Sequence, residues 1–158
     1  MNPTPPATLT SLFEAIASQQ PNDNAVLDLT QKDLAKSSIS YKDLDRASST
    51  FASHLKNNYG ITPGTKIPLV TSRSIPMVIA TLAILKLGCC YIPIDAEMWS
   101  PERIQKIVNR VGAKVIVSTV KGFEIPPAKD CENGPKIAFL GSWADKQGRL
   151  LEIGRAHV

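Results

Sequence analysis

The chain has 158 residues, of which 43% are hydrophobic and 20% are charged. This composition is typical of one globular domain or of part of one, and it excludes a largely disordered or collagen-like chain. The 18 Lys and Arg residues against 14 Asp and Glu residues give a net charge of +4, but the charges are scattered, so no nucleic-acid-binding or membrane-binding basic segment is predicted.

In chain order, the sequence predicts a loose Pro-rich arm over residues 1–8, followed by helices and strands. Helices are predicted from apolar side chains at helical spacing, over residues 10–19, 41–57, 75–87 and from Pro101 to a stop at Gly112. Strands are predicted from short apolar runs, over residues 25–29, 67–71, 89–94, 115–117 and 137–140, and Ile39 is expected to pair back on the first of them as a hairpin. From residue 67 on, apolar strands alternate with helices, which predicts an α/β fold with a mostly parallel sheet covered on both faces.

Capping and turn residues set the boundaries of these elements. Ser40 and Ser74 are expected to cap the helices that follow them, Ser40 together with Asp43 in a looser form of the capping box. Gly88 is the expected C-terminal stop of the third helix. Pro68 lies inside a predicted strand, which suggests a bulge or a strand start, because proline has no N–H to donate to a sheet.

The stretch from Ile75 to Ile94 is apolar enough to require a membrane test. Its one charge is Lys86, and a spanning helix would hold that charge toward the bilayer centre at a cost of about 2.5–3.5 kcal/mol. A deeply buried helix, a glycine stop and a buried strand explain the same residues without this cost. No membrane-spanning segment is therefore predicted.

The cysteines and the N-terminus indicate the compartment. Cys89, Cys90 and Cys131 are an odd number without a C-x-x-C motif, which favours reduced, buried thiols over a disulfide framework. Cys89 and Cys90 are expected to be inert core thiols with a raised pKa. No basic region precedes the first apolar stretch, and Glu14 interrupts it, so a signal peptide is not predicted and a cytoplasmic protein is expected.

Patterns that carry chemistry are sparse. Neither a G-x-G-x-x-G nor a G-x-x-x-x-G-K-[ST] motif is present, and the nearest segment, Gly60 to Lys66, precedes a strand and is interpreted as a plain turn. His54 lies off the apolar face of its helix and is expected to be a surface histidine. The histidines and cysteines have no metal-binding spacing, so no metal ligand is predicted.

Two positions have a functional alternative, because ligands of open α/β sheets bind beyond the carboxyl ends of the strands. Arg73, between Ser72 and Ser74 at a helix start, could hold an anion, although a capping Ser74 and a solvated Arg73 are favoured. Asp95 ends the next strand, where capping of the following loop is favoured over ligand binding.

Two segments resemble core motifs of the adenylation domains of nonribosomal peptide synthetases. Residues 39–44, with the sequence ISYKDL, are similar to the first motif, L-[TS]-Y-x-E-L. Residues 85–95, with the sequence LKLGCCYIPID, are similar to the second, L-K-A-G-x-A-Y-V-P-I-D. Residues 101–104 resemble the P-x-x-R-I helix start that follows, and the resemblance covers residues 9–120.

The departures from these motifs are Asp43, Leu87 and Cys90, and none of them puts the fold in doubt. The YIPID ending favours the peptide-synthetase branch of the adenylate-forming superfamily, since acyl-CoA ligases of this superfamily usually read N-P there. The matched positions belong to scaffold motifs and carry no catalytic role; they are Tyr41, Lys86, Gly88, Tyr91, Pro93 and Asp95.

The resemblance implies that the full-length protein activates an amino or aryl carboxylic acid with ATP to an acyl-adenylate and loads it on the phosphopantetheine of a carrier domain. Mg²⁺ is implied as well. The phosphate loop and the catalytic lysine of such enzymes have no counterpart in this sequence, so no catalytic, cofactor-binding or metal-binding residue is assigned and the chain alone is expected to be inactive. The alternatives are part of an acyl-CoA synthetase-type ligase and a small α/β binding module with its site at Arg73 and Asp95.

The expected domain organisation is a partial AMP-binding domain over residues 9–141 and an irregular tail over residues 142–158. The last seven residues, Glu152 to Val158, continue no periodic pattern. They can be back-translated as GAG ATC GGA AGA GCA CAC GTC, which resembles a common short-read sequencing adapter. Residues 152–158 are therefore interpreted as a sequencing artefact in which His157 has no biological role.

Overall fold

The computed structural model describes residues 7–30, 32, 37–125, 134–141 and 153–155, and for the last three residues the backbone alone. Four helices are described, α1 (Leu9–Gln19), α2 (Tyr41–Tyr59), α3 (Ile75–Lys86) and α4 (Pro101–Val111). The strands are β1 (Asn24–Leu27), β2 (Ser38–Ser40), β3 (Lys66–Thr71), β4 (Cys90–Asp95), β5 (Val115–Ser118), β6 (Lys136–Leu140) and β7 (Ile153–Arg155). The predicted order of helices and strands is thereby confirmed.

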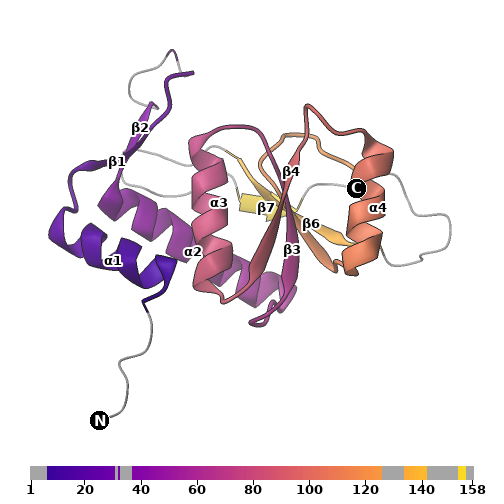
Figure 1. Cartoon of the computed structure of the whole chain (residues 1–158), viewed down its shortest axis with the longest axis horizontal. Coiled ribbons are helices and arrows are strands. Elements are labelled where there is room, and N and C mark those ends of the chain that lie inside the picture. The colour runs from indigo at the N-terminus through magenta and orange to yellow at the C-terminus, as the bar shows by residue number, and fades with distance from the viewer. Residues whose placement is uncertain (1–6, 31, 33–36, 126–133, 142–152, 156–158) are drawn as a thin grey trace, which may run out of the picture.

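The strands form two sheets (Figure 1). β1 and β2 make the predicted antiparallel hairpin, in which Val26 is paired with Ile39. The larger sheet has the strand order β4-β3-β5-β6-β7. β3 pairs in parallel with β4 and with β5, and β5 pairs in parallel with β6, which confirms the mostly parallel α/β sheet.

Alternate residues of the strands face two separate layers of helices. Ile67 and Leu69 of β3 belong to a core that α2 and α3 cover, whereas Val70, the residue after Leu69, belongs to a second core under α4. This alternation is the period of two expected of a strand that is buried on both faces. β3 lies between β4 and β5 in the described sheet and is buried from Ile67 to Thr71.

Local signals account for the helix boundaries. The hydroxyl of Ser40 accepts from the backbone N–H of Asp43 and donates to its carboxylate, and the hydroxyl of Ser74 accepts from the N–H of Met77. Both predicted N-caps are confirmed. Gly112 ends α4 with a φ of 62°, a left-handed conformation that glycine adopts without a steric penalty.

Pro68 causes no bulge, contrary to one of the two readings of the sequence. Its register with Ile92 of β4 is continuous with the residues on both sides. The Thr65 carbonyl accepts from the N–H of Cys90 in β4, and the Val70 carbonyl accepts from the N–H of Thr119, directly after β5. Because successive residues of a strand bond to opposite sides, the nitrogen of Pro68 faces β5. Pairing with β5 begins only at Leu69, so no hydrogen bond is lost.

β4 is an edge strand in the described sheet, and the prediction that it is buried was wrong. Only Ile94 within it is buried, and Cys90, Pro93 and Asp95 are exposed. β3 is its one partner strand in the described part of the chain. A continuous apolar run is typical of a strand with covered faces, but it does not show whether the covering elements are present.

The C-terminal segment contains one element where the sequence predicted an irregular tail. β7 pairs antiparallel with β6, with Phe139 opposite Gly154. The remainder of residues 142–158 lies outside the described residues, as do residues 1–6 of the N-terminal arm. Among the described helices, none is long and apolar enough to cross a membrane, and the stretch from Ile75 divides into α3 and β4.

Candidate functional site

The carboxyl ends of the parallel strands lie together at one edge of the sheet. β3 and β4 are in register there, with Thr71 opposite Asp95, and β5 ends alongside at Ser118. The structure thus brings both candidate segments, the one around Arg73 and the one at Asp95, to this carboxyl edge. An edge of this kind is where open α/β sheets bind ligands.

The Asp95 carboxylate is hydrogen-bonded within the loop that follows it. One carboxylate oxygen accepts from the N–H of Glu97 at 2.9 Å and from the N–H of Met98 at 3.3 Å, and the Asp95 carbonyl accepts from the N–H of Trp99 at 3.2 Å. The predicted capping role is confirmed. The carboxylate therefore stabilises the turn between β4 and α4.

The Ser72–Ser74 segment is a helix start. The Ser74 hydroxyl donates to the Ser72 carbonyl at 3.2 Å and accepts from the N–H of Met77, and the Thr71 hydroxyl donates to the same Ser72 carbonyl at 2.6 Å. The Arg73 side chain is exposed. Capping, the interpretation favoured from the sequence, accounts for these groups.

A set of hydroxyls at the ends of β3 and β5 was missed in the sequence. In the strand order β4-β3-β5-β6, the chain leaves β3 toward one side and β5 toward the other, so the switch point of the sheet lies between them. Ser118 is buried and bonds to the backbone of Val120, whereas the hydroxyl oxygen of Thr119 is buried with no partner among the described residues. Strand order, which no local pattern reveals, was needed to find this place.

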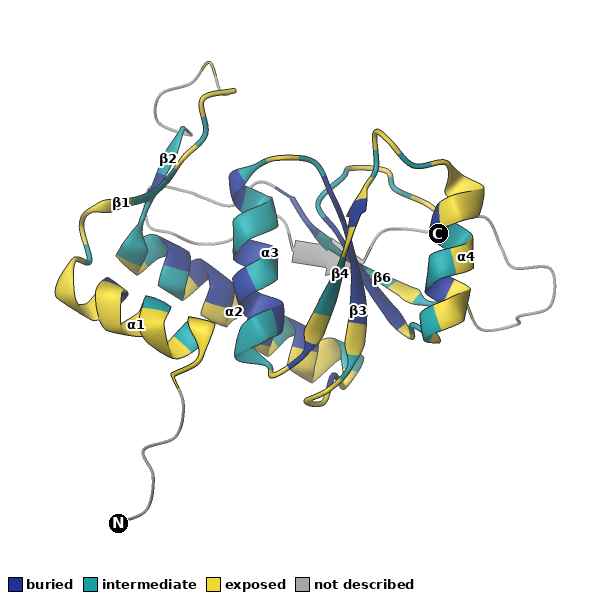
Figure 2. Ribbon diagram, viewed as in Figure 1, coloured by how far each residue is buried: buried dark blue, intermediate teal, exposed yellow. Residues whose placement is uncertain are grey.

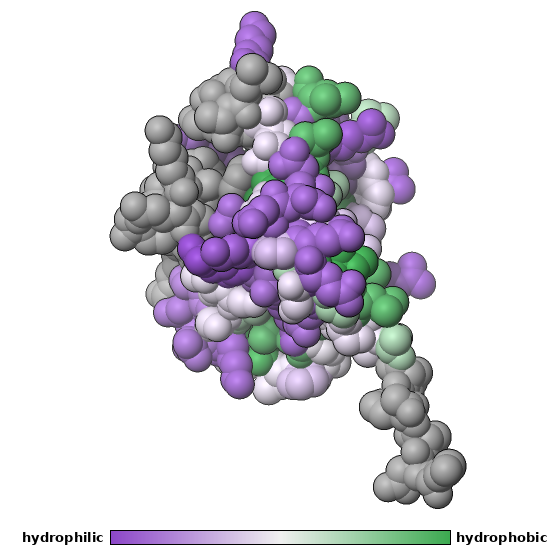
Figure 3. All heavy atoms as spheres, turned by 90° about the vertical axis from the view of Figure 1, so that its left-hand side faces the viewer, coloured by the Kyte–Doolittle hydropathy of each residue, from purple (hydrophilic) through white to green (hydrophobic). Residues whose placement is uncertain are grey.

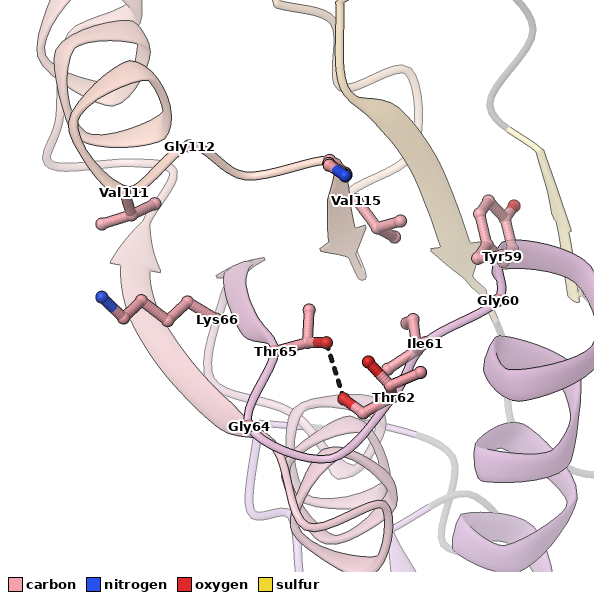
Figure 4. A pocket seen from close by; sticks show the side chains of 11 residues that line it. Tyr59, Gly60, Ile61, Thr62, Gly64, Thr65, Lys66, Val111, Gly112 and Val115 are labelled. Carbon is pink, nitrogen blue, oxygen red and sulfur yellow. Dashed lines mark hydrogen bonds between the residues drawn. The ribbon is translucent and has the colours of Figure 1, made fainter.

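The Gly60–Lys66 segment lines a pocket of about 390 Å³ at the opposite, amino end of the sheet (Figure 4). The Thr65 hydroxyl donates to the Thr62 carbonyl at 2.6 Å, and the N–H of Gly64 donates to the Gly88 carbonyl at 2.8 Å. The Lys66 side chain extends away from the loop. Because these donors are used within the fold, the segment is the plain turn that the sequence predicted and not a phosphate cradle.

The two described cysteines differ, and the prediction that both are buried was wrong. Cys89 is buried, its thiol lies 3.3 Å from the Thr62 carbonyl oxygen, and burial raises its pKa. Cys90 is exposed at the start of the edge strand β4. Successive residues of an extended segment point to opposite faces, so the two thiols have different surroundings. Cys131 lies outside the described residues.

His54 is half-buried and not a plain surface residue. Its ring stacks on Phe51 at 6.2 Å and meets the edge of Tyr59 at 5.8 Å, while Nδ1 lies 3.1 Å from the amide nitrogen of Asn58. Desolvation lowers the pKa of the imidazole. The His54 ring is partly covered because Tyr59, at the end of the same helix, packs against it.

The motif residue Lys86 connects three helices. Its side chain is 9% exposed, and its ammonium group forms an ion pair with Asp45 and donates to the Ser49 hydroxyl at 2.8 Å, both on α2. The same group lies 5.8 Å from the ring centre of Phe13 on α1. Lys86 is therefore a packing residue, in agreement with the scaffold role that the motif resemblance implies.

A family model described as AMP-binding enzyme matches residues 13–151. The chain belongs to the AMP-binding enzyme family. Among curated proteins it is 40% identical over 120 residues to the nonribosomal peptide synthetase sirP of Leptosphaeria maculans, a match that covers 76% of this chain and 5% of that protein. The chain thus spans about a twentieth of the length of that relative.

Solved structures of adenylation proteins share the fold. The N-terminal subdomain of Klebsiella oxytoca NpsA in complex with 3-hydroxyanthranilyl-AMSN matches with a TM-score of 0.66 and 22% identity, over 95% of this chain and 33% of that one. NpsA-ThdA, an artificially fused adenylation-PCP di-domain from Klebsiella oxytoca, matches with a TM-score of 0.63 and 25% identity, over 75% of this chain and 22% of that one. The fold is therefore that of the N-terminal subdomain of adenylate-forming enzymes.

Two polar side chains at the carboxyl edge cap backbone groups of the fold, namely the Ser74 hydroxyl and the Asp95 carboxylate. The hydroxyl of Thr119 has no hydrogen-bond partner among the described residues. In the described part of the chain, no group of three or more His, Cys, Asp or Glu side chains could hold a metal ion.

Proposed function

We propose that this chain is the front part of an adenylation domain that activates an amino or aryl carboxylic acid with ATP and Mg²⁺ and passes the acyl group to the phosphopantetheine thiol of a carrier domain. The observation that supports it best is the family match over residues 13–151 together with 40% identity to a peptide synthetase. The adenylation-PCP fusion among the similar structures agrees with a carrier-domain partner. Secondary metabolism is the proposed setting, and free thiols at Cys89 and Cys90 fit the cytoplasm.

The role of this portion is to build the sheet and not to perform the chemistry. Its motif residues, such as Lys86 and Asp95, bond within the fold. Purified chain is expected to show no exchange of pyrophosphate into ATP with any amino or aryl acid. Heat-inactivated chain sets the background, and exchange clearly above it would contradict the proposal.

A small binding module at Arg73 and Asp95 is the competing class of function. Equilibrium dialysis of the chain against ATP and AMP separates the two, since a scaffold portion should bind neither tightly. An acyl-CoA ligase is disfavoured by the peptide-synthetase relative, and the native downstream sequence decides that point.

We further propose that residues 152–158 are a sequencing artefact, so that β7 is not an element of the native protein, and that the native gene continues in frame beyond Leu151. A strand followed by a Ser/Thr/Gly-rich loop ending in Pro-Lys-Gly is expected next, because backbone N–H groups of such a loop can hold phosphates. Further on, a lysine on a small C-terminal subdomain and then a carrier domain are expected. Amplifying the locus from genomic DNA tests this: codons for residues 152–158 in the genome would refute the artefact, and a stop codon after residue 151 would refute the continuation.

A further inference from the structure

The apolar side of α1 is largely uncovered. Leu9, Leu12 and Ile16, which recur at helical spacing, are 64%, 54% and 41% exposed, and only Ala17 of this helix is buried. Figure 2 shows α1 almost entirely in the colour of exposed residues, in contrast to α3. An amphipathic helix forms because its apolar face is covered, so this face lacks its partner.

A groove of about 570 Å³ lies beside this face. Its wall comes from α1, the β1–β2 hairpin, α3 and the edge strand β4, and includes Leu9, Phe13, Val26, Met77, Tyr91 and Pro93. On the side of the molecule that carries α1 and the hairpin, hydrophobic side chains gather toward the right of the view beside a hydrophilic surface (Figure 3).

The groove is continuous with the hydrophobic core. Leu44, Leu69 and Leu82 belong to the main core cluster, are at most 7% exposed, and also line the groove. An interface that resembles a core cut in half is typical of parts that fold together, whereas transient docking sites are more polar. The missing partner is therefore expected to belong to the same folding unit.

We propose that this groove is the seat of a segment of the same adenylation domain that follows residue 151 in the native protein. This inference rests on the proposed function. The length of chain that is absent supports it: the match covers 33% of the NpsA N-terminal subdomain, so the greater part of a comparable subdomain lies outside this chain.

The occupant packs through side chains and does not add a strand to β4. The backbone N–H of Cys90 donates to the carbonyl of Thr65, on the side of β3. Alternate residues of β4 therefore bond to β3, and the backbone nitrogen of Pro93 faces away from β3. A proline on the outward side of an edge strand removes a donor that a further strand would need. The side chains of α1, α3 and β4 that line the groove are therefore the contact surface for the missing segment.

Two methionines provide a matched pair for the test. Met77 lines the groove, and Met98, in the turn after β4, is 78% exposed and outside it. Mild peroxide oxidation, followed by peptide mass spectrometry, is applied to this chain and to the protein expressed from the complete native gene. Oxidation follows exposure, so Met77 is expected to react on the order of tenfold more slowly in the complete protein, with Met98 unchanged.

Four results would count against the proposal or its basis, and they are distinguishable. Equal Met77 reactivity in a complete protein that exchanges pyrophosphate overturns the inference and leaves the function intact. Absence of exchange in the complete protein overturns the proposed function. A dimer of this chain with Met77 already protected assigns the groove to a second copy instead. In the complete protein, Met77→Lys is expected to lower soluble yield while Met98→Lys leaves it unchanged; equal yields would count against the groove.

Discussion

Gly88 shows at the scale of one residue why the second motif requires its glycine. Its φ is +66°, and a Cβ atom added there would lie 3.4 Å from Cβ of Pro63. Its carbonyl accepts from the N–H of Gly64, which connects the end of α3 to the turn before β3. A left-handed backbone disfavours side-chain-bearing residues by about 1–2 kcal/mol, so glycine is needed for the conformation and not for chemistry.

Cys89 and Cys90 are expected to react at different rates. With Cys131 replaced by Ser, iodoacetamide should modify Cys90 first, because Cys90 is exposed whereas Cys89 is buried and burial raises its pKa. A time course of the single variants Cys89→Ser and Cys90→Ser, followed by intact-mass spectrometry, measures each thiol separately. Equal rates in the two variants would show that both thiols are equally accessible.

His54 is expected to make the free energy of unfolding depend on pH. Desolvation lowers its pKa from 6.5, so the folded state binds fewer protons than the unfolded state near that pH. The stability contribution is therefore fully present above pH 6.5 and is lost as the pH falls through and below it. Protonation would also set two donors, Nδ1–H and the Asn58 amide, against each other.

Urea unfolding of the chain and of His54→Gln, on either side of the ordinary histidine pKa, isolates this effect. The difference in unfolding free energy between the two pH values should be smaller in the variant. Asp and Glu residues titrate alike in both proteins and cancel in the comparison. An identical pH dependence would mean that His54 is as hydrated in the folded state as in the unfolded one.

At the scale of elements, α2 and α3 are joined by a polar contact at the margin of their apolar interface. The Lys86 ammonium group bonds to the carboxylate and the carbonyl of Asp45 and to Ser49. We expect Lys86→Met to reduce the free energy of unfolding by about 1.5–3 kcal/mol, the range of hydrogen bonds to charged groups. Lys56→Met on the exposed side of α2 is the control and should change it by less than about 0.5 kcal/mol.

Urea denaturation followed by circular dichroism measures both variants. If Lys86→Met is as stable as the control, packing of the methionine has replaced the charged contact. That outcome would contradict the prediction and would mean that the charged contact adds no net stability. Equal stability would mean that only the length of the Lys86 side chain, and not its charge, matters at this motif position.

At the scale of the whole molecule, the uncovered apolar surface predicts poor solubility and binding of the dye ANS by the chain expressed alone. Leu12 and Ile16 form part of this surface. The double change Leu12→Lys, Ile16→Lys is expected to lower ANS fluorescence at least twofold, on the order of the loss of half of such a patch. Leu29→Lys is the control, since Leu29 is 92% exposed but lies outside α1.

Fluorescence titration with the dye at fixed chain concentration provides the measurement. A monodisperse chain with a sharp, cooperative thermal transition and no dye binding would contradict this prediction. It would also show that the described elements form a complete core on their own.

The sequence by itself determined the order and type of the elements, because each depends on signals within a few residues. Ser40, Ser74 and Gly112 act on their own helix ends, and the alternation of strands and helices from residue 67 on is sufficient for a parallel sheet. Only the tertiary structure decided which apolar faces are covered. The exposure of Cys90, the half-burial of His54, the contact of Lys86 with α2 and the open side of α1 all depend on which distant segments are present to pack, and hydrophobic periodicity contains no information about that partner.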